Sequence, residues 1–382
     1  MIQVKARLAL LWLTLRLTTL AVAVLAFLYE QGTTSLQPLK LLLAPWYNYD
    51  AVHYVRIVQY GYNVGEITSG FHPLYPWTAR VLFLLFREPL VSLLIVTSIA
   101  GLLLTFVFFR LVRLDHDQST SWTATALLLC WPASLAIFAP YTEALFLLLS
   151  VSCLLMARQR HFWIAGFLGG LAALTRQHGI FLTLPLAWEI WEASGKSFRT
   201  LFARWNALPS VLLVPAGYAV WIGYRAFVIS DVQPDFSSVQ RFIYSVMVSP
   251  TAYSIYQEQQ FTWPWTAITK AAAILWNGGS HLSVLGDLTL AAAFIAMFIF
   301  GWRQLRTSYR IYSLVVILVA LSYHTGSLNP YISLPRHMLP AFPVFIGFAA
   351  SYRFKRLPFV LCVLGATQAL FLCCYVWETW VL

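Results

Sequence analysis

The sequence predicts an all-α integral membrane protein that crosses the bilayer many times. Of the 382 residues, 60% are hydrophobic and only 10% are charged. Soluble domains contain about 25% charged residues, so this composition is typical of a polytopic membrane protein. Aromatic residues make up 16% of the chain, which suits side-chain belts at the two membrane surfaces. Because no internal repeat or soluble segment interrupts the apolar pattern, residues 1–382 are expected to form one domain.

Eleven apolar segments are candidates for transmembrane helices, since a bilayer core of about 30 Å needs about 20 helical residues. The expected spans are residues 8–29, 88–109, 121–139, 142–157, 162–175, 178–193, 207–229, 282–302, 311–326, 337–351 and 357–377. The first is too long for a signal-peptide core and lacks a small-residue cleavage site, so we expect a retained signal anchor. Several of the others are short, which implies a thinned bilayer or ends that differ by a few residues.

The positions of Lys and Arg predict the orientation. If the N-terminus is cytoplasmic, 15 of the 25 Lys and Arg residues lie in or beside the short cytoplasmic loops, as the positive-inside rule requires. The net charge of +11 therefore arises from scattered loop clusters and not from the basic patch of a nucleic-acid-binding protein. The outer side then carries two long loops, at residues 30–87 and 230–281, and the C-terminus.

Two segments in these loops are expected to be helices that do not span the membrane. Residues 73–86 are apolar, but a helix of this length reaches only about 21 Å. A complete crossing would also move every later basic cluster outside, so the charge rule favours a half-helix against the outer leaflet. Residues 263–276 carry Trp at both ends and are expected to lie in the interface.

Several kinds of site have no signal in this sequence. The five Cys residues lie in apolar runs without metal-ligand spacing, so we expect them to be small apolar residues of helices. The chain contains no GxxxxGK[ST], GxSxG or HExxH motif. An activated substrate is therefore expected to come from the membrane or the outer side, which favours a lipid-linked donor.

Polar residues gather at segment ends that are all predicted to face the outer side. An ionisable residue at a membrane boundary is costly, so such residues mark functional sites. The candidates come from five separate segments and are Asp50, His53, Arg56, His72, Tyr75, Tyr141, Glu143, Arg176, His178, Asn329, Arg336 and His337.

Asp50 is the candidate catalytic residue, in the stretch Trp46–Arg56. A carboxylate at an aromatic, partly dry surface can take a proton from a hydroxyl in a transition state. Asp50 and His53 are three residues apart and would share a helix face. A structural interpretation, which is compatible with this role, is that Asp50 caps a helix that starts at Ala51. Asp50, His53 and His72 also have the chemistry of divalent-metal ligands, although hydrogen bonding from His to phosphate is preferred and no cofactor is required.

Each of the other charged candidates has two interpretations, one in which it binds substrate and one in which its role is structural. Glu143 begins a helix, where it would either complement the helix dipole or bind substrate hydroxyls. Arg176 and Arg336 would either snorkel to the interface or bind a phosphate group, whose oxygens match the guanidinium fork. The phosphate interpretation is preferred for at least one of them.

These stretches resemble the PIG-V-like (GPI mannosyltransferase 2-like) mannosyltransferase family of the GT-C glycosyltransferase superfamily. The motifs that carry the resemblance are Trp46–Tyr54, Gly61-Tyr62, Phe71–Pro76, Pro140–Phe146, Gly169–Arg176 and Pro335–Pro343. The resemblance implies a GT-C-type helical bundle, a polyprenyl- or dolichyl-phosphate sugar, typically mannose, and a base in the first outer loop, which is Asp50 here. His53 and His72 stand where the family often has an aromatic residue, and Gln177 where it often has Pro, which leaves the sugar and acceptor open.

The expected activity is an inverting transfer of a hexose, with mannose preferred, to a hydroxyl of a glycan, lipid or protein acceptor. The site would face outward from a plasma or inner membrane, or into the lumen of the endoplasmic reticulum. The alternative is a membrane transporter or lipid flippase. That class predicts internal repeats and charges in the middle of spans, whereas the charges here gather at one rim.

Overall fold

The structure is a computed structural model. In the residues that it describes, the regular elements are helices apart from one pair of two-residue strands, which confirms the all-α class. The structure describes residues 2–31, 37–63, 67–203, 205–230, 235–238, 241, 260–276, 282–326, 330–352 and 356–379. Within these ranges, five helices are long and apolar enough to cross a membrane. The protein is thus a polytopic membrane protein, while the predicted count of eleven spans is not confirmed.

The five long helices are α1 (Ile2–Gln31), α5 (Pro89–Val112), α11 (Pro209–Tyr224, continued by a π turn at Arg225–Ile229), α15 (Leu282–Gly301) and α19 (Leu357–Val376). Shorter helices are α6 (Gln118–Cys130), α7 (Glu143–Arg158), α8 (Phe162–Thr175), α9 (Thr183–Ala193), α16 (Thr307–Ser322) and α18 (Pro343–Ser351). The connecting segments contain α2 (Pro38–Leu43), α3 (Asp50–Tyr60), α4 (Leu74–Phe86), α10 (Phe198–Ala203), α14 (Pro264–Trp276) and α17 (Leu334–Met338). Strands β1 (Gln260–Phe261) and β2 (Tyr323–His324) pair antiparallel.

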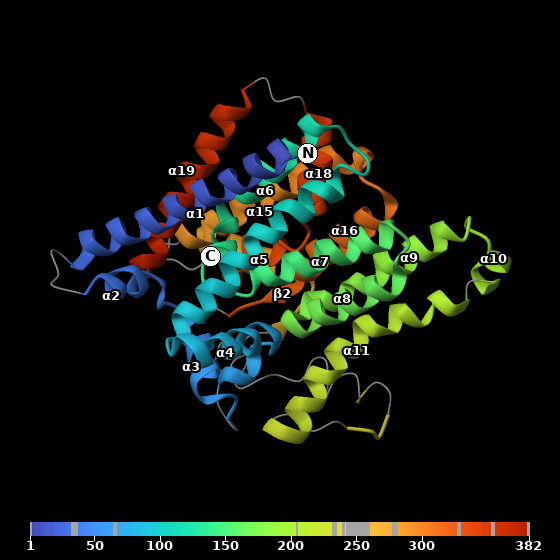
Figure 1. Ribbon diagram of the computed structural model, residues 1–382, viewed down its shortest axis with the longest axis horizontal. Coiled ribbons are helices and arrows are strands. Elements are labelled where there is room, and N and C mark those ends of the chain that lie inside the picture. The colour runs from blue at the N-terminus through green and yellow to red at the C-terminus, as the bar shows by residue number, and fades with distance from the viewer. Residues whose placement is uncertain are drawn as a thin grey trace.

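The helices pack in two connected rows (Figure 1). In one row α4, α5, α7, α8 and α11 contact one another in succession. In the other, α1 contacts α19, which leads through α6 and α18 to α15. Helix α5 joins the rows because it packs on both α1 and α6, and α16 packs against α9 and α17. As a result, buried residues from the beginnings of α3 and α7 and from the short helix α17 belong to the same hydrophobic core.

Four predicted spans are broken near the candidate residues. Helix α6 ends at Cys130, and a 3₁₀ turn at Pro132–Ile137 follows, since Pro cannot continue the hydrogen-bond ladder. Residues 178–193 begin as a 3₁₀ turn, 311–326 end in β2, and 337–351 divide into parts of α17 and α18. Hydropathy alone did not reveal these breaks because the irregular backbone is as apolar as the helices around it.

The two predicted non-spanning segments are helical. Helix α4 has 13 residues and therefore rises about 20 Å, less than the thickness of a bilayer core. It packs on α3 and α5. Helix α14 ends at Trp276, and the rings of Trp263 and Trp265 stack at 4.9 Å near its start. In the first long loop the expected helices near residue 51 and at 73–86 are present as α3 and α4, and α2 is an additional helix.

Helices α8 and α11 approach so closely that their backbones touch at glycines. A Cβ atom added to Gly217 would lie 2.1 Å from the carbonyl oxygen of Gly170. A Cβ atom on Gly170 would lie 2.6 Å from the carbonyl oxygen of Leu213. Small residues permit this kind of contact between membrane helices. The contact fixes α8, whose end carries Arg176.

Gly217→Ala is expected to destabilise the protein by about 1–3 kcal/mol, because the new methyl group must push the two helices apart. Gly223→Ala is the matched control on the same helix, since a Cβ atom there meets nothing within 4 Å. Removing the glycine at position 223 is expected to raise stability by up to about 1 kcal/mol. Denaturation of both variants in detergent measures the difference, and equal effects would contradict the close contact.

Candidate functional site

Four charged side chains from four separate segments form one chain of ion pairs. Asp50 lies in the first turn of α3, Glu143 is the first residue of α7, Arg176 follows α8, and Arg336 lies in α17. Nη2 of Arg336 is 2.6 Å from Oδ2 of Asp50. Nε of Arg336 and Nη1 of Arg176 both bond to Oε1 of Glu143. The formal charges of the four groups cancel.

The ion-pair chain is buried at its centre, at Glu143 and Arg336, and more exposed at its ends, at Asp50 and Arg176. Glu143 is 1% exposed and Arg336 is 6% exposed. The side chains of Asp50 and Arg176 are 18% and 11% exposed. Buried ion pairs need additional hydrogen bonds and good geometry to offset desolvation. Asp50 is therefore the member of the chain that a bound substrate reaches most easily.

Two neighbours of Glu143 hold the guanidinium groups in place. Thr142 Oγ1 accepts a hydrogen bond from Nη1 of Arg176 at 3.0 Å. The guanidinium carbon of Arg336 lies 4.2 Å from the ring centre of Tyr141, a cation–π contact. Tyr141, Thr142 and Glu143 are consecutive, so the segment that starts α7 positions both arginines at once.

Local backbone geometry places the arginines. A Cβ atom at Gly179 would lie 2.2 Å from the backbone nitrogen of Ala173, so the backbone folds back tightly against the end of α8. Arg176 lies in the turn between these two contact points. Ser333 has a left-handed backbone with φ of 61°, and its carbonyl accepts from the backbone N–H of Arg336 at 3.0 Å. Left-handed φ is uncommon outside glycine, which marks this turn as one that tertiary contacts impose.

The C-terminal helix holds the segment before Asp50. Asn48 Nδ2 donates to the carbonyl oxygen of Tyr375 at 3.1 Å, and the Tyr375 hydroxyl donates to the carbonyl of Trp46 at 3.2 Å. Tyr49 has φ of 50°, an unusual value for a large side chain directly before a candidate base. Residues 46–50 are therefore constrained by a helix that begins about 300 residues later in the chain.

Sequence reasoning missed Asn48, Tyr375 and Arg16 as supporting residues. Arg16 of α1 donates to the carbonyl of Phe138, and its guanidinium lies over the Trp46 ring at 5.5 Å. A charged residue within the first apolar span was the available signal for Arg16. Tyr375 lies in an apolar run, and no local pattern distinguishes it.

His178 and His337 lie close to the ion-pair chain, and both interact electrostatically with Arg176. The rings of His178 and His337 lie 6.1 Å apart and nearly parallel. Each follows closely on one of the two arginines, Arg176 and Arg336, in the sequence. Within the described ranges, Nδ1 of each ring is buried and has no hydrogen-bond partner. Two imidazoles thus stand beside the guanidinium groups.

His53 and Arg56 lie further along α3. The His53 ring stacks on Phe71 at 5.0 Å. Burial lowers the pKa of His53, and the carboxylate of Asp50 partly opposes this shift. The neutral imidazole is therefore favoured at neutral pH. Arg56 is exposed, one turn beyond His53.

His72 and Tyr75 make their polar contacts inside the protein. His72 Nδ1 lies 2.9 Å from the carbonyl oxygen of Ala173, and burial lowers the pKa of this imidazole to about 3. Tyr75 is fully buried, with its hydroxyl 3.1 Å from the carbonyl of Leu93 and 2.8 Å from Oγ1 of Thr97. The structure thus brings neither polar group into the ion-pair chain. Asn329 lies outside the described residues.

Two alternative roles of Asp50 can be compared with the geometry. Helix α3 begins at Asp50 and not at Ala51, and the residue at the N-cap position is Tyr49, which makes no side-chain cap bond. The capping interpretation of Asp50 is therefore wrong. Among the described residues, no three His, Cys, Asp or Glu side chains are grouped to bind a metal ion, so Asp50, His53 and His72 do not form a ligand set there.

A second cluster of charges lies at the other end of α7. Arg158 binds both carboxylate oxygens of Asp115 at 2.5 and 2.7 Å and the hydroxyl of Tyr309 at 3.1 Å. Arg306 continues the cluster to Glu189 at 3.7 Å. Because α7 has 16 residues, its two ends are about 22 Å apart. The two clusters are therefore separated by most of the thickness of a membrane core.

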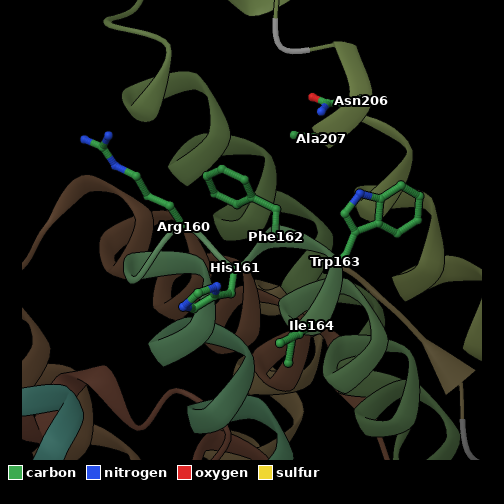
Figure 2. Close-up of a pocket in the computed structure, with 7 residues that line it drawn as sticks. All are labelled: Arg160, His161, Phe162, Trp163, Ile164, Asn206 and Ala207. Carbon is green, nitrogen blue, oxygen red and sulfur yellow. The ribbon is translucent and has the colours of Figure 1, made fainter.

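A cavity of about 470 Å³ also lies at this second end (Figure 2). The turn between α7 and α8, the first turn of α8 and the segment before α11 supply its lining: Arg160, His161, Phe162, Trp163, Ile164, Asn206 and Ala207. It contains none of the predicted site residues. This cavity is thus separate from the Asp50 site.

The fold and the site together define an integral membrane protein with an acid–arginine cluster at one end of a helical bundle. Residues 14–206 match the family described as mannosyltransferase (PIG-V), and because this match covers half of the chain, the protein belongs to that family, as its motifs predicted. The matched region contains Asp50, Glu143 and Arg176 but ends before Arg336.

A curated relative supports the same family. The GPI mannosyltransferase 2 of Schizosaccharomyces pombe is 26% identical over 204 residues, which is 49% of this chain and 43% of the relative. The match therefore spans less than half of the relative's length.

Solved structures with a similar arrangement include two membrane proteins. The Archaeoglobus fulgidus oligosaccharyltransferase tethered to an acceptor peptide has a TM-score of 0.49 and 14% identity, over 96% of this chain and 56% of that one. ArnT of Cupriavidus metallidurans bound to undecaprenyl phosphate has the same score and identity, over 91% and 62%. Scores below 0.5 indicate only a loose likeness in fold.

Proposed function

We propose that the protein transfers a hexose, with mannose preferred, from a polyprenyl-phosphate donor to an acceptor hydroxyl on the outer face of the membrane. The observation that carries this proposal is the pairing of the partly exposed Asp50 carboxylate with Arg336, which connects through Glu143 to Arg176. This arrangement offers a proton acceptor beside two cations. Membership of a mannosyltransferase family supports sugar transfer and the choice of mannose.

In the proposed reaction Asp50 is the general base. Its carboxylate takes the proton from the acceptor hydroxyl as that oxygen attacks the anomeric carbon. The bond between the anomeric carbon and the phosphate oxygen breaks on the opposite side, so the configuration inverts. The proton ends on Asp50, and the lipid phosphate leaves with one more negative charge than it had in the donor.

The Asp50–Arg336 pair couples these two charge changes. When Asp50 gains a proton it becomes neutral, and Arg336 loses an anionic partner at the moment that the phosphate gains a charge. A preorganised cation that is released in this way stabilises the transition state more than the ground state. Arg176 would bind the same phosphate, with His178 and His337 as neutral hydrogen-bond donors. Acceptor or sugar hydroxyls would lie near His53 and Arg56 on α3.

The topology supports a lipid-linked donor on the outer side. The cluster around Arg158 contains two of the basic residues predicted to be cytoplasmic, Arg158 and Arg306, and the Asp50 site lies at the opposite end of α7. The phosphate-binding motif GxxxxGK[ST] is missing from the sequence. A donor that diffuses in the bilayer would present its phosphate at the ion-pair chain and its prenyl chain to the apolar helices.

The test supplies purified protein in nanodiscs with a glycolipid extract and one of two radiolabelled donors. We expect label to enter the extract from dolichyl- or undecaprenyl-phosphate mannose and not from GDP-mannose. Transfer from GDP-mannose alone would overturn the proposal. Movement of the labelled lipid between leaflets without any transfer would instead support the flippase alternative.

A further inference from the structure

Glu143 is the residue that joins the two arginines of the site. A single oxygen, Oε1, accepts from Nε of Arg336 and from Nη1 of Arg176. The other oxygen faces the Thr142 hydroxyl at 3.5 Å. Glu143 is 1% exposed, whereas the side chain of Asp50 is 18% exposed. These contacts of Glu143 are thus with protein groups, where the sequence left both a helix-dipole role and binding of substrate hydroxyls open.

Two guanidinium groups that share one carboxylate oxygen would repel each other without it. Like charges a few ångströms apart in a poorly solvated site repel strongly, so the side chains would turn away from each other. With Glu143 between them, the two forks are fixed side by side. Such a pair matches the oxygens of one phosphate group.

We propose that Glu143 is a positioning residue, which holds Arg176 and Arg336 together for the phosphate of the lipid-linked substrate and does not itself touch the sugar. This inference rests on the proposed function. It assigns to Glu143 an effect on phosphate binding that acts only through the arginines.

A purely structural role is the competing explanation, and the protein contains a matched control for it. Glu189 is 5% exposed and also faces two arginines, with Arg158 at 3.8 Å and Arg306 at 3.7 Å. It also accepts from the Ser308 hydroxyl at 2.5 Å. Because Glu189 belongs to the cluster at the opposite end of α7, Glu189→Gln removes the same kind of charge away from the site.

The experiment measures binding of undecaprenyl phosphate and dolichyl phosphate to the 382-residue protein in detergent, with the free polyprenol, which lacks the phosphate, as a control lipid. Glu143→Gln is expected to weaken phosphate binding about 10- to 100-fold, the size of a lost charge-assisted contact, and to leave polyprenol binding unchanged. The donor KM should rise to a similar extent, and the acceptor KM should not change. Glu189→Gln should lower the melting temperature and leave lipid phosphate binding as in the wild type.

A double-mutant cycle separates indirect from direct action. In an Arg176→Gln background, Glu143→Gln should cost less phosphate affinity than it does alone, because one of the two groups it positions is already missing. Equal losses in both backgrounds would mean that Glu143 contacts the ligand itself, and would overturn the inference. If Glu143→Gln does not fold, Glu143→Asp keeps the charge on a shorter side chain. Wild-type phosphate affinity in that variant would also overturn the inference.

The outcomes for the inference and for the proposed function differ. A wild type that binds polyprenyl phosphate in a Glu143-dependent way but transfers no sugar would contradict the function and support the inference. If the wild type transfers sugar and Glu143→Gln binds phosphate as the wild type does, the function is supported and the inference is contradicted. No phosphate binding by the wild type would overturn both.

Discussion

Asp50→Asn is expected to lower kcat for sugar transfer by about 10²–10⁴-fold, the usual contribution of a general base. Asn has nearly the same shape but cannot accept the proton of the acceptor hydroxyl. The amide oxygen can still accept a hydrogen bond from Arg336, so the variant should fold. Binding of polyprenyl phosphate should be preserved or become tighter, because Arg336 loses its anionic partner and becomes freer to bind the phosphate.

Steady-state transfer assays and lipid-phosphate binding of the same preparations test this expectation. Asp115→Asn is the matched control, since Asp115 pairs with Arg158 as Asp50 pairs with Arg336. That control should reduce stability and keep kcat near the wild-type value. Near wild-type turnover by Asp50→Asn would remove Asp50 from the role of base.

The sequence predicted the fold class and several helices well because apolar runs are local signals. Helix α8 coincides with the predicted segment 162–175, and α19 differs from the predicted segment 357–377 by one residue. Helix α4 was expected from its length and from the charge rule, and the structure shows a helix shorter than a bilayer core. The break after Cys130 was missed because the segment that follows is as hydrophobic as a helix.

The residues of the site could be selected from the sequence, but their pairing could not. Charges at segment ends are costly in a membrane, which was sufficient to select Asp50, Glu143, Arg176 and Arg336. Which acid meets which base depends on tertiary contacts, and Glu143 and Arg336 are 193 residues apart. The sequence therefore left open whether Glu143 complements the helix dipole or binds substrate hydroxyls, and the structure places its carboxylate between two arginines. His72 and Tyr75 illustrate the same limit, because their partners, Ala173 and Thr97, lie on other helices.

Arg336→Gln is expected to destabilise the protein by about 3–5 kcal/mol, because removing one partner leaves buried carboxylates less compensated. It should also lower kcat by about 10²–10³-fold, the typical loss when one transition-state stabilising donor is removed. Arg336→Lys keeps the charge but not the planar fork, so it should recover part of the stability and little of the rate. Denaturation in detergent and transfer assays measure the two effects separately.

The sign of the rate change decides what Arg336 does. If its only effect were to hold Asp50 in an ion pair, Arg336→Gln would free the carboxylate and the rate would rise. If Arg336 stabilises the leaving phosphate, the rate falls although the base has become free. Arg158→Gln provides the comparison, because Arg158 pairs with Asp115 at the opposite end of α7 and its loss should lower stability without a comparable change in kcat. A fall in rate that is confined to Arg336→Gln therefore assigns the guanidinium to the phosphate, and a rise assigns it to the restraint of Asp50.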